Sequence, residues 1–353
     1  MNCQTYLKHC AVALMLLGTI ISKCSADSLE RAAIAACHDQ LQNVVLDCEE
    51  TRTYNIDPAV AADAPLHFRQ PQPDLNRTES SALKFSFLDG NARFERSLSK
   101  DTLNYWASKG LPAIVRQIQT ISATGRIEEL TTQELTNGKR PSFGGFRQLA
   151  AFAPDVTIDI ALGLRLLGAR QWLSDDDLSA MQEVAQRDPS LTILQVKDGS
   201  GRVHELHFDS RLLYALVYYR CTNSVGGFVE ITNTDFQRIG NTFIPGTIVR
   251  SSSVTDSTGQ IRHPIVFTIS MKKASVNDEK NTLDQYSIWW PAHLELFDAR
   301  TNDRIKVGPT TRPFTDADIR TQVAATRAQN RSMDQMAAER IRQALESQPS
   351  DGH

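Results

Sequence analysis

Residues 83–97 read LKFSFLDGNARFERS, and this stretch decides the fold class. Apolar and polar side chains alternate on both sides of Asp89-Gly90, which is the period of a β-strand with one buried face. An Asp-Gly pair between two such runs is a strong signal for a two-residue hairpin turn. The stretch therefore predicts two antiparallel strands.

More strand candidates follow along the chain. A second candidate hairpin covers residues 114–130 around Ala123-Thr124-Gly125. Strand-like runs then recur between Gly and Ser turns, at residues 191–196, 203–208, 212–221, 228–236, 243–250 and 265–272. No helix fits between consecutive runs, so they predict an antiparallel meander with one apolar and one solvated face.

Three segments have helical patterns instead. Residues 28–43 place apolar side chains at helical spacing, and residues 143–186 interrupt the strands with helical patterns at 158–167 and after a capping Ser174. Within the second segment we expect the pair Gly144-Gly145 to form a turn. From Thr315 to about Ser347 the chain is charged and rich in alanine, which predicts a helical extension that the core does not need.

The first 26 residues have the order of a secretory signal peptide. Basic residues at Lys8 and His9 precede an apolar run at 10–21, and the small-residue triplet Cys24-Ser25-Ala26 follows. The run is shorter than the roughly 20 residues that span a bilayer, and no second apolar run of that length follows. We expect cleavage after Ala26, a periplasmic or secreted mature protein, and no transmembrane segment in it.

The net charge restricts the classes of partner that we expect, and the cysteine content restricts the possible disulfides. With 38 basic and 41 acidic residues the net charge is −3, so nothing global attracts nucleic acid. The mature chain would keep Cys37, Cys48 and Cys221, which permits one disulfide and one buried thiol. The sequence leaves the pairing open, and Cys37 with Cys48, which would close the short loop, is our hypothesis.

No catalytic constellation, metal site or cofactor motif emerges from the sequence. His204-Glu205-Leu206-His207 places two histidines three apart on a predicted strand, where they point to opposite faces, whereas the zinc motif needs them four apart on a helix. No serine stands in a nucleophile elbow, and no glycine-rich stretch fits a phosphate. We therefore expect a protein that is not an enzyme and uses no cofactor.

Apolar and aromatic residues on the predicted strands remain as candidates for function. They form either an ordinary core or a partly unfilled face that receives a lipid or another apolar ligand. Because alternate residues of a strand share a face, six side chains are candidate ligand contacts on one concave surface. They are Leu206, Phe208, Leu216, Tyr218, Phe267 and Ile269.

The order of elements and three loose motifs resemble the LolA/LolB-like superfamily of periplasmic lipoprotein carriers, over roughly residues 28–308. The motifs resemble most the divergent secreted members common in planctomycete-like bacteria. They are residues 235–245 (DFQRIGNTFIP), the strand at 265–277 that ends in Val-Asn, and residues 294–307 with Phe297-Asp298-Ala299-Arg300-Thr301. The long loop at 57–80, the helical region and the C-terminal extension exceed a minimal carrier.

The resemblance implies an α+β fold with a strongly curved antiparallel sheet, an incomplete β-barrel, packed on helices and followed by a C-terminal helical extension. We expect a signal peptide at 1–26, the curved-sheet domain at 27–312 and a charged tail at 313–353. The implied function is binding of a lipid, an acylated protein or another apolar envelope component in the concave face. The alternative is a structural or regulatory envelope module with a filled core, which acts on an envelope protein through its surface.

Overall fold

The computed structural model divides into two units, Met1–Gly90 with Ala151–Asn281 (unit 1) and Asn91–Ala150 with Thr282–His353 (unit 2). The structure describes residues 41–55, 74, 76–123, 126–135, 137–148, 157–163, 182–184, 188–223, 227–255, 261–300, 302–311, 313–315 and 317–321, and scattered residues from 324 to 340. The predicted signal peptide, residues 28–40 of the helix predicted at 28–43 and the predicted helix after Ser174 lie outside this part of the chain, and they stay predictions. Residues 41 and 42 are not helical, and Asn43, the expected end of the first helix, begins a strand.

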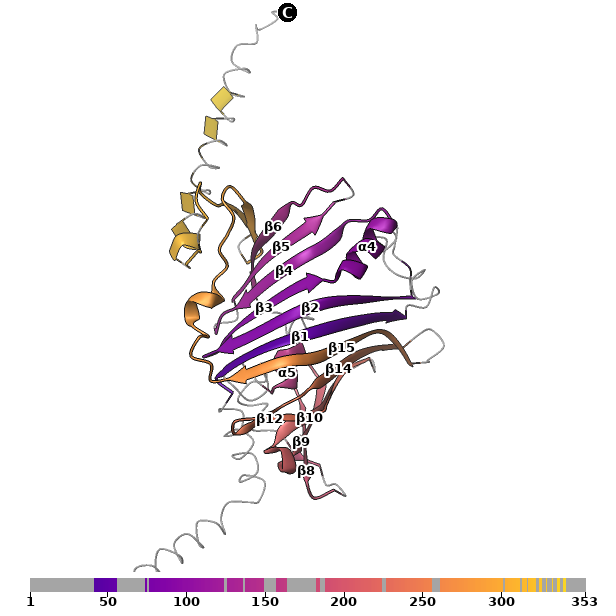
Figure 1. The fold of residues 1–353 in the computed structure, drawn as a ribbon. Coiled ribbons are helices and arrows are strands. Elements are labelled where there is room, and N and C mark those ends of the chain that lie inside the picture. Colours follow the sequence, from indigo (N-terminus) through magenta and orange to yellow (C-terminus); the bar gives the residue numbers. More distant parts are fainter. Residues whose placement is uncertain are drawn as a thin grey trace, which may run out of the picture. The chain divides into compact units, whose positions relative to one another are not determined.

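Unit 1 is built on antiparallel strands in the order β2-β1-β15-β14-β11-β10-β9-β8-β7 (Figure 1). The strands are β1 (Asn43–Asn55), β2 (Asn76–Leu88), β7 (Gln182–Glu183), β8 (Leu191–Lys197), β9 (Val203–Asp209), β10 (Ala215–Thr222), β11 (Phe228–Thr234), β14 (Thr247–Thr255) and β15 (Ile261–Val276). A separate two-stranded sheet pairs β12 (Gln237–Ile239) with β13 (Thr242–Ile244). The predicted runs from 191 to 272 thus contain strands with the expected antiparallel pairing. Three bounds are wrong, because the run at 212–221 begins in a turn, the run at 228–236 ends as a strand at Thr234, and the run at 243–250 divides between β13 and β14 of two sheets.

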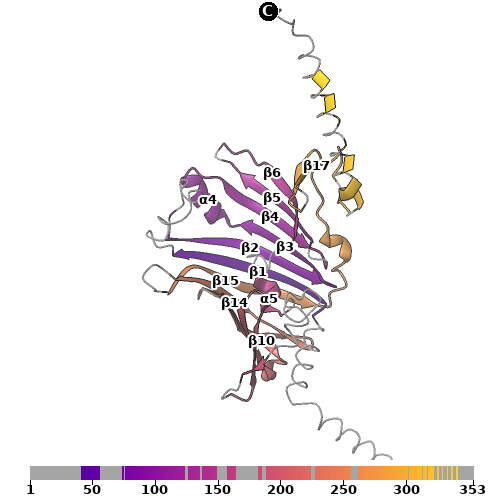
Figure 2. The same ribbon diagram turned by 180° about the vertical axis from the view of Figure 1, so that it is seen from behind.

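The shorter elements of unit 1 are α5 (Thr157–Ala161) and the 3-10 turn η3 (Ser210–Leu212). The helix α5 packs against β10, β11 and β14, and Figure 2 shows it beside β14. Its residues Ile158 and Ile160 are buried. The helix ends at Ala161, within the helical pattern expected at 158–167, of which the structure describes residues 158–163.

Unit 2 has the strand order β17-β16-β6-β5-β4-β3. Its elements are β3 (Asn91–Leu98), α4 (Lys100–Ser108), β4 (Ala113–Ile121), β5 (Arg126–Glu134), β6 (Ser142–Gln148), the 3-10 turn η4 (Leu283–Tyr286), β16 (Glu295–Asp298) and β17 (Asp303–Lys306). The predicted hairpin at 114–130 is confirmed as β4 and β5. Strands β6 and β16 run parallel, and the other pairs of the unit are antiparallel.

The predicted two-residue turn at Asp89-Gly90 lies between the end of β2 at Leu88 and the start of β3 at Asn91. Asp89 has φ 47° and Gly90 has φ 80°. Two consecutive positive φ angles are those of a type I′ turn, which Asp-Gly adopts readily. The turn chemistry read from the sequence is confirmed.

The core of unit 2 is closed by Trp290, which is fully buried beside the ring of Phe146, with 5.4 Å between ring centroids. Gly144 makes this packing feasible, because a Cβ there would lie 2.6 Å from the Trp290 ring and 2.3 Å from the carbonyl oxygen of Glu129. At Gly145 a Cβ would lie 2.0 Å from the carbonyl oxygen of Phe297. The Gly144-Gly145 pair, expected to form a turn, therefore lies inside β6, where two close contacts require residues without side chains.

The predicted α+β fold, a strongly curved incomplete β-barrel packed on helices, is wrong. The described residues form a mixed, sheet-dominated structure, and in neither unit does their sheet close on itself. Among these residues α4 and α5 have nine and five residues, too few for a helical layer. The prediction failed partly because the segment taken as a helical interruption begins with strand β6.

The start of the predicted C-terminal tail belongs to the core of unit 2. Residues 317–321 are helical, and Phe314 and Ile319 are buried in the cluster that contains Trp290. The burial of Ile319 argues against the expectation that the core does not need the chain from Thr315 onward, and that expectation stays a prediction. The predicted domain boundaries themselves stay predictions.

Candidate functional site

Five of the six predicted ligand contacts lie on one face of the sheet in unit 1. Residues directly opposite each other in antiparallel strands share a face. Phe208 of β9 lies directly opposite Leu216 of β10. A second row of directly opposite residues crosses five strands. That row is Leu206, Tyr219, Ile231, Arg250 and Phe267. We call the surface that carries Leu206, Phe208, Leu216, Phe267 and Ile269 the inner face of unit 1.

The structure places the sixth residue, Tyr218, on the opposite face. The register between β10 and β9 shifts between Leu216 and Tyr218, so that Tyr218 faces His207 and Tyr219 takes the inner position. Such a β-bulge inserts one residue and inverts the alternation beyond it. The Tyr218 hydroxyl donates to Glu230 Oε2 at 3.2 Å, in a polar setting.

The central part of the inner face is a filled core. Leu206 and Phe208 are 0% exposed, and Leu216 and Ile269 are buried. The side chains therefore make no open groove at these positions, which is the packing that the alternative function requires.

Asn233 holds α5 on this face. Its Nδ2 group donates to the carbonyl oxygens of Ala161 at 2.8 Å and Leu216 at 2.7 Å. Arg250 Nη1 donates to Thr157 Oγ1 at 3.4 Å, at the other end of the helix. The Oδ1 atom of Asn233 is buried with no hydrogen-bond partner among the described residues. A short helix and a few polar contacts thus close the core.

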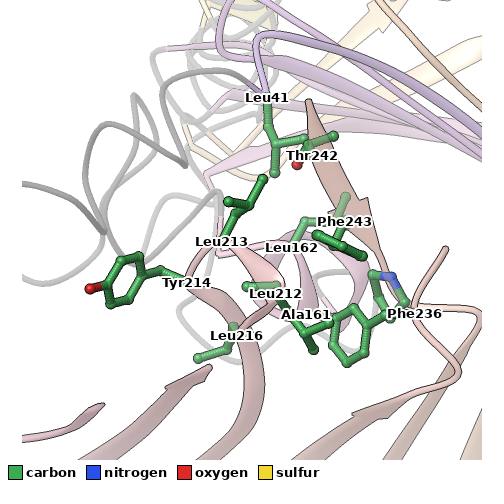
Figure 3. Close-up of a pocket in the computed structure, with 12 residues that line it drawn as sticks. Leu41, Ala161, Leu162, Leu212, Leu213, Tyr214, Leu216, Phe236, Thr242 and Phe243 are labelled. Atoms are coloured by element: carbon green, nitrogen blue, oxygen red, sulfur yellow. The ribbon is translucent and has the colours of Figure 1, made fainter. Parts of the chain in front are cut away.

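A small apolar pocket lies beside α5 (Figure 3). Its cavity volume is about 20 Å³, room for about one water molecule. In Figure 3 Leu213 and Leu162 lie between Leu41 on one side and Phe236 on the other, and Tyr214 points away from them. The lining residues are Leu41, Ala161, Leu162, Leu212, Leu213, Tyr214, Ala215, Leu216, Phe236, Thr242, Phe243 and Pro245. The pocket shares Leu216 with the inner face, and most of its lining side chains are apolar, with Tyr214 and Thr242 as the polar ones.

The backbone at the edge of the pocket is strained. Leu213 and Tyr214 have φ angles of 53° and 57°, a left-handed conformation that bulky residues rarely adopt. The turn is fixed by Asp209, whose carboxylate accepts from the Arg211 backbone N–H at 2.9 Å and pairs with its guanidinium at 2.7 Å. Leu213 is left 41% exposed. Strain of this kind often marks a functional position.

The sequence reading missed this edge because it joined residues 212–221 into one strand. Asp209-Ser210 was the available signal, since both residues favour turns and helix caps. The pocket residues Phe236 and Phe243 were recognised only as apolar strand positions. They come together because the β12–β13 hairpin lies near β10.

Along β1 and β2 the inner face changes from apolar to charged. The Phe267 ring lies 5.0 Å from the guanidinium of Arg52 and 5.2 Å from that of Arg250. The Arg52 guanidinium pairs with the buried carboxylate of Glu50 at 3.2 Å. Burial opposes the charge of Arg52, but Glu50 raises the pKa of Arg52 above the usual value. A second pair joins Arg77 to Glu79 at 2.7 Å. One surface therefore offers an apolar region beside paired charges.

The two histidines of the predicted strand at 203–208 lie on opposite faces, as expected. His204 is buried, with Nδ1 3.0 Å from the Tyr219 hydroxyl and Nε2 3.1 Å from Asp198 Oδ2. His207 Nε2 lies 2.7 Å from Glu205 Oε1. For Asp198 burial opposes ionisation, but hydrogen bonds from Ser200, His204 and the backbone lower its pKa to about 2. His204 thus has a structural role in joining β9 and β10 to the turn that follows β8.

Cys48 and Cys221 are buried thiols, neither bonded to another described cysteine. Burial, reinforced by Asp47 and Glu50, raises the pKa of Cys48 to about 12. Burial also raises the pKa of Cys221 to about 11. Both are therefore poor nucleophiles. Cys37 lies outside the described residues, so its pairing with Cys48 stays a prediction.

In the described parts of the chain, no helix combines the length and apolar character that crossing a membrane requires.

Comparisons with known proteins give no family. No family model and no curated protein matches the sequence. Among solved structures, a DUF1329 family protein from Desulfovibrio piger aligns with TM-score 0.39 and 8% identity, over 73% of this chain and 95% of that chain. Acetoacetate decarboxylase from Legionella pneumophila aligns with TM-score 0.11 and 10% identity, over 67% and 87% of the two chains. MucB in complex with MucA(peri) aligns with TM-score 0.10 and 11% identity, over 70% and 93%. All three TM-scores are low, and these likenesses carry no argument about function.

Proposed function

We propose that this is an exported, non-enzymatic binding protein that holds an apolar chain of a lipid, an acylated protein or another envelope component on the inner face of unit 1. The observation that carries the proposal is the apolar pocket beside α5. Most of its lining side chains are apolar, it continues into the core through Leu216, and Leu213 at its edge is exposed. An apolar ligand gains roughly 0.8 kcal/mol for each methylene that such a site buries.

The cavity must be larger in the ligand-bound protein than in this structure. A cavity of about 20 Å³ cannot hold an acyl chain, so the ligand would enter by displacing α5 or the Leu213 turn. Both are small elements: α5 has five residues, and the turn, which Asp209 fixes, contains two left-handed residues. The charged end of the same face, with Arg52 and Arg250 around Phe267, would then face a polar end of the ligand.

A matched pair of substitutions tests the proposal. Asparagine tolerates the left-handed conformation, so Leu213→Asn removes apolar contact at the pocket while the backbone keeps its shape. We expect cis-parinaric acid, a fluorescent fatty acid, to bind the wild type and to bind Leu213→Asn about 10-fold more weakly, as expected for the loss of one leucine contact. The unfolding free energy should stay the same or rise.

The control is Leu283→Asn, which changes an exposed leucine in unit 2. It should bind the probe like the wild type. Equal affinities of all three proteins, or no binding to the wild type, would contradict the proposal.

The second candidate function, a structural or regulatory envelope module with a filled core, is favoured by the complete burial of Leu206 and Phe208. It predicts no uptake of a fatty acyl probe. Export is tested separately, since N-terminal sequencing of the protein made in its own cells should begin at Asp27. A mature chain that begins at Cys24 and carries a lipid would contradict cleavage after Ala26.

A further inference from the structure

We propose that unit 2 contains a second binding site, for a small molecule with an apolar body and a single anionic group, in the cleft beside α4. The cleft has a volume of about 420 Å³, within the range of small-molecule sites. It lies between α4, the turn after it, the start of β4, the end of β5 and the turn that joins β5 to β6 (α4 is labelled in Figure 1). This site is independent of the function proposed for unit 1.

One face of α4 forms a wall of the cleft. The lining positions are three, four and seven residues apart, as one side of a helix requires. They are Lys100, Leu103, Asn104, Ala107 and Leu111, the last in the turn that follows the helix. Ser99 caps the helix, since its hydroxyl accepts from the Thr102 backbone N–H at 3.2 Å, so this wall begins at a fixed point. The helix presents Leu103, Asn104 and Ala107 in the middle and Lys100 at one end.

The opposite wall comes from the β5–β6 hairpin and includes Leu135, Gly138, Glu134 and Arg140. Gly138 has φ 77°, and a Cβ there would meet nothing within 4 Å, so the hairpin turn leaves open space. Leu135 and Gly138 are joined by a hydrogen bond of 2.9 Å between their backbones, which fixes the turn. The two walls therefore line the space with four leucine and alanine side chains and with polar ones. The apolar ones are Leu103, Ala107, Leu111 and Leu135.

The charges of the rim favour a monoanion. Arg140 is neutralised by Glu134, whose Oε2 atom lies 3.0 Å from Nε and 2.7 Å from Nη2. Lys100 makes no ion pair with any residue in the described part of the chain. One positive charge is left over, at the end of an apolar wall. A ligand with one sulfonate, phosphate or carboxylate on an apolar body matches this pattern.

Two dyes that differ in one charge test the site. 8-Anilinonaphthalene-1-sulfonate has an apolar body and one sulfonate, and N-phenyl-1-naphthylamine has the same body without charge. Both should bind the full-length protein with enhanced fluorescence. Measurements are made in the Leu213→Asn background, so that the pocket of unit 1 contributes little.

Substitutions in the cleft should separate charge from shape. Lys100→Met should weaken the binding of the sulfonate dye about 2- to 5-fold, because it removes one solvent-exposed ion pair. It should leave the affinity for the neutral dye unchanged. Lys139→Met removes a neighbouring exposed charge that does not line the cleft, and it should change the affinity for neither dye. Ala107→Phe fills the cleft from the helix and should weaken both dyes at least 10-fold.

Hydrogen exchange locates the bound dye. The sulfonate dye should slow amide exchange in residues 100–111 and 133–140 of the Leu213→Asn protein. Equal binding of the sulfonate dye to Lys100→Met and Lys139→Met, unchanged binding to Ala107→Phe, or no protection of these segments would overturn the proposal. Loss of the dye signal on Leu213→Asn alone would place the dye in unit 1 and overturn it as well.

Discussion

The two units close their cores in different ways. Unit 2 places a large aromatic side chain, Trp290, directly on a glycine of the sheet, and Phe314 and Ile319 complete the cluster. Unit 1 covers its inner face with the five-residue helix α5, and Asn233 links this helix to β10 by donating to the carbonyl oxygens of Ala161 in α5 and Leu216 in β10. The first core is closed by one large side chain in tight contact with the sheet, whereas the second is covered by a helix of only five residues. The difference teaches where this protein can admit a ligand without unfolding.

The largest expected effect concerns the C-terminal segment. A chain that ends at residue 313 loses the burial of Phe314 and Ile319, which would cost roughly 3 to 6 kcal/mol of stability, because each fully buried side chain contributes about 1.5 to 3 kcal/mol. A chain that ends at residue 321 keeps both and should unfold like the full-length protein. Thermal unfolding of the two truncated proteins measures the difference. Equal melting temperatures would show that unit 2 closes without this segment.

Phe208→Ala tests whether the inner face of unit 1 is as well packed as the core of unit 2. Phe208 is fully buried, so the substitution should create a cavity and cost about 3 to 5 kcal/mol of unfolding free energy. Phe297→Ala, at a half-exposed position in unit 2, serves as the control and should cost less than about 1 kcal/mol. A small loss for Phe208→Ala in urea unfolding would indicate an open groove instead of a packed face.

The sequence identified the strands well and the inner face in part. Alternation in residues 83–97 and the turn preference of Asp89-Gly90 are local properties, and both were confirmed. The side on which Tyr218 lies depends on one extra residue between Leu216 and Tyr218, and no local signal revealed that bulge. The role of Gly144-Gly145 depends on Trp290 and Phe297, which lie about 150 positions later in the chain and follow from tertiary packing.

Asn233→Ala tests the fastening of α5. Removing the two hydrogen bonds leaves the carbonyl oxygens of Ala161 and Leu216 unpaired, at a cost of about 2 kcal/mol. If α5 must move to admit a ligand, the same variant should also bind the fatty acid probe more tightly than the wild type. Asn55→Ala, at the exposed end of β1, is the control and should alter neither quantity. Weaker probe binding by Asn233→Ala would argue that α5 has to stay in place.

The smallest expected effect is a pH dependence in unit 1. The pKa of Asp198 is about 2 in the folded protein, below its usual 3.8, so its ionised form stabilises the fold above the usual pKa. That contribution is lost as the pH falls from about 4 toward 2. Asp198→Asn should therefore flatten the acid side of the stability profile, measured by urea unfolding between pH 2 and pH 6. An unchanged acid slope would show that the hydrogen bonds to Ser200 and His204 add no stability.

The central claim, that the weakly closed face of unit 1 accepts an apolar chain, is tested most directly by native mass spectrometry of the protein purified from the cells that make it. We expect the wild type to carry one co-purifying lipid or acylated molecule. Leu213→Asn should carry much less of it, and Leu283→Asn as much as the wild type. A wild-type protein that carries no apolar molecule, and that also fails to bind cis-parinaric acid, would contradict the claim and leave a packed domain that acts through its surface.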